Sequence, residues 1–142
     1  MENSGIILFV GRIYSININE RRVRKMKYLR QFLKFDWDSF SSGKEFRVTG
    51  TAPWQDYDTK AILGTAVEVV IYQDKTKYNF KNGDTRTNQF EKINFKIRKE
   101  NVSIPAGTPV EPVNPSCTIY GDFGNLLSVK ADDIRNVKVA KD

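Results

Sequence analysis

The sequence predicts an all-β domain preceded by a short N-terminal helix. Three observations support this fold class. After residue 43, apolar and polar residues alternate with a period of two in several segments, which is typical of half-buried strands. Peptides rich in Gly, Asn, Asp and Pro separate these segments, and such peptides favour turns and loops. A helical period is confined to the first 43 residues.

The first two strands are expected at residues 46–52 and 64–73. One face of the first strand carries small and apolar residues, namely Phe46, Val48, Gly50 and Ala52. The second strand is rich in β-branched residues, which favour pleated sheets, and one of its faces carries Val67, Val69 and Ile71. The polar stretch 53–60 between the two strands is predicted to be a loop.

A long polar segment, residues 74–88, separates the second strand from the third. The peptide Asn82-Gly83-Asp84 indicates a tight turn, so we interpret this segment as a hairpin tip that projects from the domain. The third strand is expected at residues 89–98, where Ile93, Phe95 and Ile97 face one way. Aromatic and basic residues therefore occupy its opposite, outward face.

The C-terminal part of the chain is predicted to end in a hairpin. After the connector 100–107, the prolines within residues 108–113 restrict that segment to an edge strand or a bulged strand. Residues 117–121 and 126–131 then flank the turn-rich tetrapeptide Asp122-Phe123-Gly124-Asn125.

Residues 1–43 are expected to form an N-terminal arm, and residues 44–142 the main domain. Within the arm, residues 20–35 have a helical period, with Val23, Met26, Leu29 and Leu33 three or four residues apart and Arg and Lys between them. We expect an amphipathic basic helix here. It either caps one end of the β-domain or contacts a partner or DNA.

The first 25 residues have two interpretations. Residues 21–26 read Arg-Arg-Val-Arg-Lys-Met, a peptide that a ribosome-binding sequence followed by a start codon would encode. On this interpretation residues 1–25 are not native and the protein begins at Met26. The other interpretation is a genuine arm that forms a homo-oligomer, with residues 6–10 adding a strand to the sheet edge of a neighbouring subunit.

The composition argues against an enzyme and against a bound cofactor. Histidine is absent and Cys117 is the one cysteine, so Cys/His zinc sites and His-dependent nucleophilic triads are excluded. Neighbouring residues of a strand point to opposite faces, so Asp132 and Asp133 do not form a metal site. The longest apolar run, residues 6–10, is too short to span a bilayer. We therefore expect a soluble, cytoplasmic protein without a membrane partner, and its net charge of +6 favours a polyanionic one.

Several short phrases resemble known DNA-binding proteins. Residues 46–54 resemble the opening strand of bacterial single-stranded-DNA-binding proteins, and residues 107–111 and 128–134 resemble their closing strands. Residues 110–115, together with 129–134, are similar to OB-fold proteins encoded on Gram-positive conjugative plasmids and transposons.

The resemblance covers about residues 44–138. It implies a five-stranded OB-fold, a Greek-key barrel whose second and third strands bind oligonucleotides. It also implies binding of single-stranded DNA during DNA transfer. The connector 100–107 is shorter than the helix that this family has between its third and fourth strands, so the tetramer of that family is not expected.

Sequence-independent binding of single-stranded DNA requires cations along the backbone path and flat rings on which bases stack. Both occur together on the third strand, on its neighbours and in residues 75–86, and further aromatic residues lie in the first loop and beside the last turn. The candidate DNA-binding residues are Arg47, Trp54, Tyr57, Tyr72, Lys75, Lys77, Tyr78, Phe80, Lys81, Arg86, Phe90, Lys92, Lys96, Arg98, Tyr120 and Lys130.

The predicted function is sequence-independent binding of single-stranded DNA in conjugative transfer or plasmid replication. Binding of double-stranded DNA is left open. The alternative is an OB-fold accessory protein that holds other members of a transfer or replication complex and has little affinity for DNA.

Overall fold

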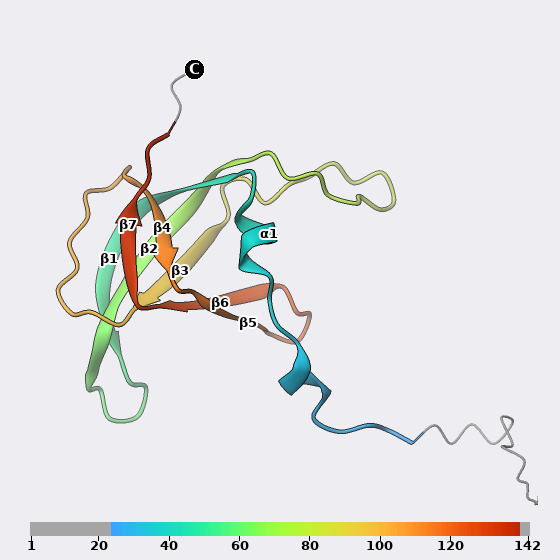
Figure 1. Ribbon diagram of the computed structural model, residues 1–142, viewed down its shortest axis with the longest axis horizontal. Helices are drawn as coiled ribbons and strands as arrows, with labels where there is room; N and C mark the ends of the chain where they lie inside the picture. Colours follow the sequence, from blue (N-terminus) through green and yellow to red (C-terminus); the bar gives the residue numbers. More distant parts are fainter. Residues whose placement is uncertain (1–23, 140–142) are drawn as a thin grey trace, which may run out of the picture. The chain divides into compact units, whose positions relative to one another are not determined.

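The computed structural model describes residues 24–139 (Figure 1). The chain divides into two compact units, residues 1–33 and 34–142. The prediction of a strand at residues 6–10 and the prediction that the protein begins at Met26 both depend on residues 1–23. These residues lie outside the described part of the chain. In the first unit, the described residues contain one 3-10 turn, η2 (Leu29–Phe32).

The amphipathic helix expected at residues 20–35 is wrong for the portion that the structure describes, because residues 24–35 contain no α-helix. Tyr28 has a left-handed backbone (φ 63°), which interrupts helical geometry. The segment also places Arg30 and Lys34 one helical turn apart with no acidic residue between them, and such like-charge pairs destabilise a helix.

The short N-terminal helix lies further along the chain, as α1 (Trp37–Ser41). Asp36 caps it, because its carboxylate accepts hydrogen bonds from the backbone N–H of Ser39 (3.1 Å) and from the Ser39 hydroxyl (2.6 Å). Trp37 stacks on Phe46 with 5.4 Å between ring centroids, so α1 packs against the sheet core. No helix within residues 24–139 is long and apolar enough to cross a membrane.

The second unit is built around one mixed, seven-stranded sheet with the order β5-β6-β3-β2-β1-β4-β7. All neighbouring strands are antiparallel except β3 and β6, which are parallel. The strands are β1 (Lys44–Gln55), β2 (Ile62–Asp74), β3 (Lys92–Ile97), β4 (Pro109–Val113), β5 (Ser116–Tyr120), β6 (Leu126–Ala131) and β7 (Asp133–Asn136).

The structure has seven strands where the sequence predicts five. The pairing of β4 with β7 reaches Val113 and Asp133, and the pairing of β5 with β6 begins at Ser116 and Lys130. Ser116 lies three residues after Val113, and its partner Lys130 lies three residues before Asp133. A single antiparallel register therefore runs through both ladders. The interruption falls at Asn114, which has a left-handed backbone (φ 51°). Because β5 and β7 are the two edges of the order, the ladders do not close into a barrel.

The predicted core is confirmed on β2 and β3. Five apolar residues assigned to the inner face of these strands are at most 2% exposed: Val67, Val69, Ile71, Phe95 and Ile97. On β1 the prediction that inner-face residues are buried is confirmed for Phe46 and Val48. It is wrong for Ala52, which is exposed. A register shift between Val48 and Gly50 reverses the alternation, so Ala52 lies on the outer face beside Ala66.

Candidate nucleic-acid interface

The outer face of the sheet brings together predicted residues that lie far apart in the sequence. The register places Ala66 of β2 beside Lys96 of β3, and Lys96 beside Lys130 of β6. On β1, Trp54 pairs with Gly64 of β2. Four strands therefore supply one continuous outward surface.

Trp54, Lys96 and Lys130 form a compact group, which we call the Trp54 cluster. The Nζ atoms of Lys96 and Lys130 each lie 5.9 Å from the centre of the Trp54 ring. Within residues 24–139, neither ammonium group forms an ion pair. Like charges on paired residues of adjacent strands destabilise a sheet. A bound anion such as a phosphate would relieve this repulsion.

Small residues give this surface its flat floor. A Cβ atom on Gly64 would lie 3.2 Å from Cε3 of Trp54 and 1.9 Å from the carbonyl oxygen of Ile97. Gly64 thus allows the indole ring and strand β3 to approach the backbone of β2. Ala52 and Ala66 lie on the same face. Sequence reasoning did not assign these residues to the site, and the one available signal was a small residue within a strand pattern.

A groove of about 1000 Å³ adjoins the Trp54 cluster, and we call it the long groove. Its floor includes Lys92, Asn94 and Lys96 of β3. The segment 75–91 between β2 and β3 is called the arm from here on, and it is distinct from the N-terminal arm of residues 1–43. One wall of the groove comes from the returning limb of this arm, residues 84–91, and the other is the end of the β5–β6 hairpin. Figure 1 shows the arm and this hairpin extending on the same side of the sheet, with α1 between them. The predicted residues that line the groove are Arg86, Lys92, Lys96 and Tyr120.

Several predicted aromatic residues present their rings to solvent. Phe90 is 66% exposed and holds a left-handed backbone (φ 72°), which is uncommon for a bulky residue. Its N–H donates to the carbonyl of Ile71 (2.7 Å), which fixes the backbone there. Tyr57 is 87% exposed, and the ammonium group of Lys60, a residue that the sequence did not single out, lies 5.2 Å from its ring. Phe80 and Tyr120 are also exposed.

The arginines of the predicted site are engaged within the protein. Arg47 pairs with Glu45 and lies over the Tyr72 ring, 4.0 Å from its centre. Arg86 pairs with Glu91 (3.0 Å), and Arg98 pairs with Asp132 (3.2 Å).

The lysines divide into one paired residue and five others. Lys92 lies 3.6 Å from Glu68, whose pKa is lowered by a hydrogen bond from Thr49 and by Lys92 itself. The predicted lysines that form no ion pair with another described residue are Lys75, Lys77, Lys81, Lys96 and Lys130. These five are the cations most available to an external phosphate.

Tyr78 has a different environment from the other predicted aromatic residues. It is half-buried, its hydroxyl donates to Asp74 (2.6 Å), and its ring lies 5.8 Å from that of Phe80. The hydroxyl of Tyr78 is therefore part of the protein's own hydrogen bonding. Asp74 and its buried partner Lys44 were not identified as site residues from the sequence.

Two other groups considered at the sequence level have ordinary structural roles. Asp132 pairs with Arg98 and Asp133 with Lys99 (2.7 Å), so each carboxylate has its own cation. Cys117 is half-buried, and burial raises the pKa of its thiol to about 11. A thiol with this pKa is protonated at neutral pH and is a poor nucleophile.

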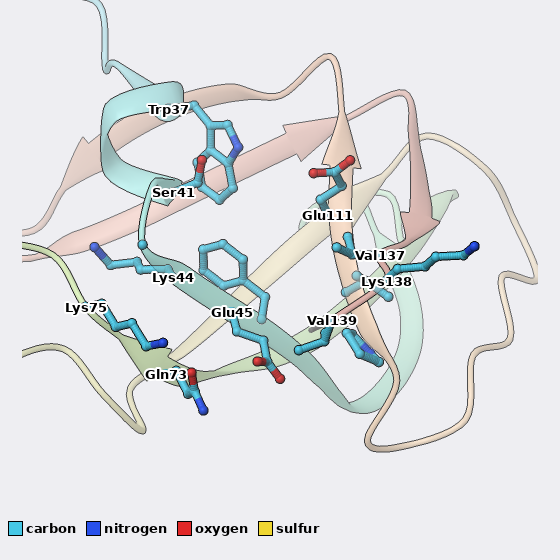
Figure 2. A pocket seen from close by; sticks show the side chains of 14 residues that line it. Trp37, Ser41, Lys44, Glu45, Gln73, Lys75, Glu111, Val137, Lys138 and Val139 are labelled. Atoms are coloured by element: carbon cyan, nitrogen blue, oxygen red, sulfur yellow. The ribbon is translucent and has the colours of Figure 1, made fainter. Parts of the chain in front are cut away.

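A second cavity, of about 340 Å³, lies beside the first residues of β1 (Figure 2). Lys75 and Gln73 lie at one end of it, and Val137 and Val139 lie at the other. Its two carboxylates belong to Glu45 and Glu111, and each pairs with an arginine. Lys75 is the one predicted DNA-binding residue in its lining.

We compared the chain with protein families, with curated proteins and with solved structures. No protein-family model matches the chain, and no curated protein and no solved structure matches it.

Proposed function

We propose that this protein binds single-stranded DNA without sequence specificity, through the Trp54 cluster and the long groove. The observation that carries the proposal is the proximity of the Trp54 ring to two lysines that have no acidic partner among the described residues. A DNA base could stack on the Trp54 ring, and the phosphates on either side of that base could pair with the two lysines.

The strand pairing supports an OB-fold. In this proposal, β4 and β5 are two halves of one bent strand, and β6 and β7 are two halves of another, because a single register runs through both ladders. The sheet then consists of a β1–β2–β3 meander, a strand parallel to β3 and a strand antiparallel to β1. This arrangement is the one expected of a five-stranded, partly open OB-fold barrel, and it supports that part of the proposal.

The chemistry of the surface favours contacts that do not depend on base identity. Every base has a π-face, so stacking on the half-buried ring of Trp54 and on the exposed rings of Phe90 and Tyr120 tolerates any sequence. Lysine ammonium groups contact phosphates as point charges and carry no sequence information. The arginines, which read guanine edges in other proteins, are held in ion pairs here.

A role in conjugative DNA transfer or plasmid replication is part of the proposal. It rests on the resemblance of residues 110–115 and 129–134 to OB-fold proteins of Gram-positive conjugative elements. Single-stranded DNA is the form in which a plasmid strand is transferred, which suits a protein with a stacking surface.

A charge-matched pair of variants tests the proposed surface. Lys96→Ala with Lys130→Ala removes two cations from the Trp54 cluster. Lys99→Ala with Lys138→Ala removes two cations from elsewhere. Measured by fluorescence anisotropy with labelled oligo-dT, the cluster variant should bind about tenfold or more weakly, and the control should change less than about threefold. Equal losses would mean that net charge alone governs binding. Absence of binding by the unmodified chain would favour the accessory-protein alternative.

A further inference from the structure

One carboxylate, that of Asp74 at the end of β2, connects both limbs of the 75–91 arm. Its Oδ1 atom accepts a hydrogen bond from the backbone N–H of Thr76 (3.1 Å). Its Oδ2 atom accepts from the Tyr78 hydroxyl (2.6 Å) and from the backbone N–H of Asn88 (3.0 Å). Thr76 and Tyr78 belong to the outgoing limb and Asn88 to the returning limb. The two limbs are therefore bridged at the base of the arm.

Lys44, the first residue of β1, supplies the opposite charge. Its Nζ atom lies 3.5 Å from Oδ1 of Asp74, and both side chains are 0% exposed. The same ammonium group donates to the Phe40 carbonyl of α1 (2.9 Å) and to the Thr76 hydroxyl (2.9 Å). A buried ion pair stabilises a structure only when hydrogen bonds satisfy its remaining groups, and this pair meets that condition.

Other contacts fix the same junction. The amide of Asn88 donates to the Tyr78 hydroxyl (3.0 Å), which adds a second link between the limbs. Gly43 has a left-handed backbone (φ 81°), and a Cβ atom there would lie 3.3 Å from the backbone of Lys75 and of Thr76. Burial raises the pKa of Asp74, but its hydrogen bonds outweigh this effect and lower the pKa to about 2. The carboxylate is therefore ionised at neutral pH.

We infer that Asp74 is a positioning residue for DNA binding, which clamps the two limbs of the arm so that its returning limb forms a fixed wall of the long groove. The inference rests on the proposed function. Asp84, Arg86, Thr87, Asn88 and Glu91 of that limb line the groove. A wall that is already ordered does not lose conformational entropy when DNA binds, so the clamp increases affinity without contacting DNA.

Tyr78→Phe tests the clamp with little risk to folding, because it keeps the ring and the buried ion pair and removes only the hydroxyl, which is one of the two links between the limbs. We expect oligo-dT affinity to fall about three- to tenfold. Trypsin should also cleave the arm faster at Lys77, Lys81 and Arg86, while the melting temperature changes little. Tyr28→Phe, which removes an exposed hydroxyl from the first unit, should change neither quantity. Unchanged cleavage and unchanged affinity in Tyr78→Phe would overturn the inference.

A thermodynamic cycle separates positioning from a general loss of stability. Asp74→Asn is combined with Phe80→Ala, Lys81→Ala and Arg86→Ala, which remove three of the arm's candidate DNA contacts. If Asp74 acts through the arm, Asp74→Asn should weaken binding about tenfold in the unmodified protein and less than about twofold in the arm variant. Equal effects in both backgrounds, or an arm variant that binds as well as the unmodified chain, would contradict the inference. Failure of the unmodified chain to bind DNA would instead contradict the proposed function, and if Asp74→Asn does not fold, Tyr78→Phe decides.

Discussion

In the proposed function, stacking depends most on Trp54, since its ring lies within reach of two cations on the outer face of the sheet. The chain has two tryptophans, and the other, Trp37, packs against the core. In a Trp37→Phe variant, all tryptophan emission comes from Trp54, and oligo-dT should quench it. Trp54→Ala should reduce affinity by about 1–3 kcal/mol, the range for the loss of one stacked base. Emission from Trp54 that is unaffected by bound DNA would place the site elsewhere.

The buried pair of Lys44 and Asp74 gives a prediction about pH. The pKa of folded Asp74, about 2, is lower than the ordinary value of 3.8, so its contribution to stability is fully present above pH 3.8 and is lost as the pH falls towards 2. Asp74→Asn should therefore cost about 3–5 kcal/mol at neutral pH, because it leaves a buried ammonium group without its anion. Denaturant unfolding at several pH values should show this difference shrinking in acid. A difference that stays constant down to pH 2 would contradict the assignment.

Restoring an apolar pair is the control for this prediction. Lys44→Met combined with Asp74→Leu removes both charges, and such replacements of a buried ion pair are often neutral or stabilising. The double variant should recover most of the stability that Asp74→Asn loses. If it remains as unstable as the single variant, hydrogen bonding rather than charge pairing dominates at this site.

At the level of elements, the contact between β2 and β3 depends on one glycine. A Cβ atom on Gly64 would collide with the carbonyl of Ile97, and no atom lies within 4 Å of the corresponding position on Gly50. Gly64→Ala should reduce the free energy of unfolding by about 2–4 kcal/mol, because the two strands must separate or shift. Gly50→Ala should change it by less than about 0.5 kcal/mol. Equal stabilities of the two variants would show that β3 lies further from Gly64 than described.

The strands that alternate cleanly could be predicted from the sequence, and those with irregularities could not. Ile93, Phe95 and Ile97 occupy the core as their alternation predicts. The register shift after Val48 leaves no mark in the pattern, because Gly50 and Ala52 suit either face. The helix expected at residues 20–35 is wrong over the described residues 24–35 for a related reason, since a helical period shows which residues could share a face and not whether a packing partner exists.

The sequence could predict which residue types make up the candidate site. It could not predict which of these residues lie together or which of them form ion pairs. The ion partners of Arg98 and Arg135 lie 34 and 24 residues away in the sequence, so which cations remain available depends on the fold. The juxtaposition of Lys96 and Lys130 likewise requires the parallel pairing of β3 with β6. Asp74 gave no signal at all, because its role comes from the hydrogen bonds that it accepts after folding.

For the whole molecule, electrostatics should control affinity without controlling sequence preference. The net charge is +6, and five lysines of the predicted surface have no ion-pair partner within residues 24–139. Each phosphate that they neutralise releases counterions, which makes binding weaker at higher salt. Mixed-sequence and oligo-dT strands should bind within a few-fold of each other. A duplex of equal length should bind more weakly, because its bases are not free to stack on exposed rings.

The most direct test is a titration of fluorescently labelled oligo-dT with the full chain. Binding is measured by fluorescence anisotropy at several salt concentrations between about 50 and 200 mM. Each contacted phosphate of a single strand contributes about −0.7 to the slope of log affinity against log salt concentration. Contacts from three to five lysines therefore predict a slope of about −2 to −3.5. In the Lys96→Ala, Lys130→Ala variant, the slope should become less negative by about 1.4. Binding that does not depend on salt, or a slope that this variant leaves unchanged, would contradict the proposed surface.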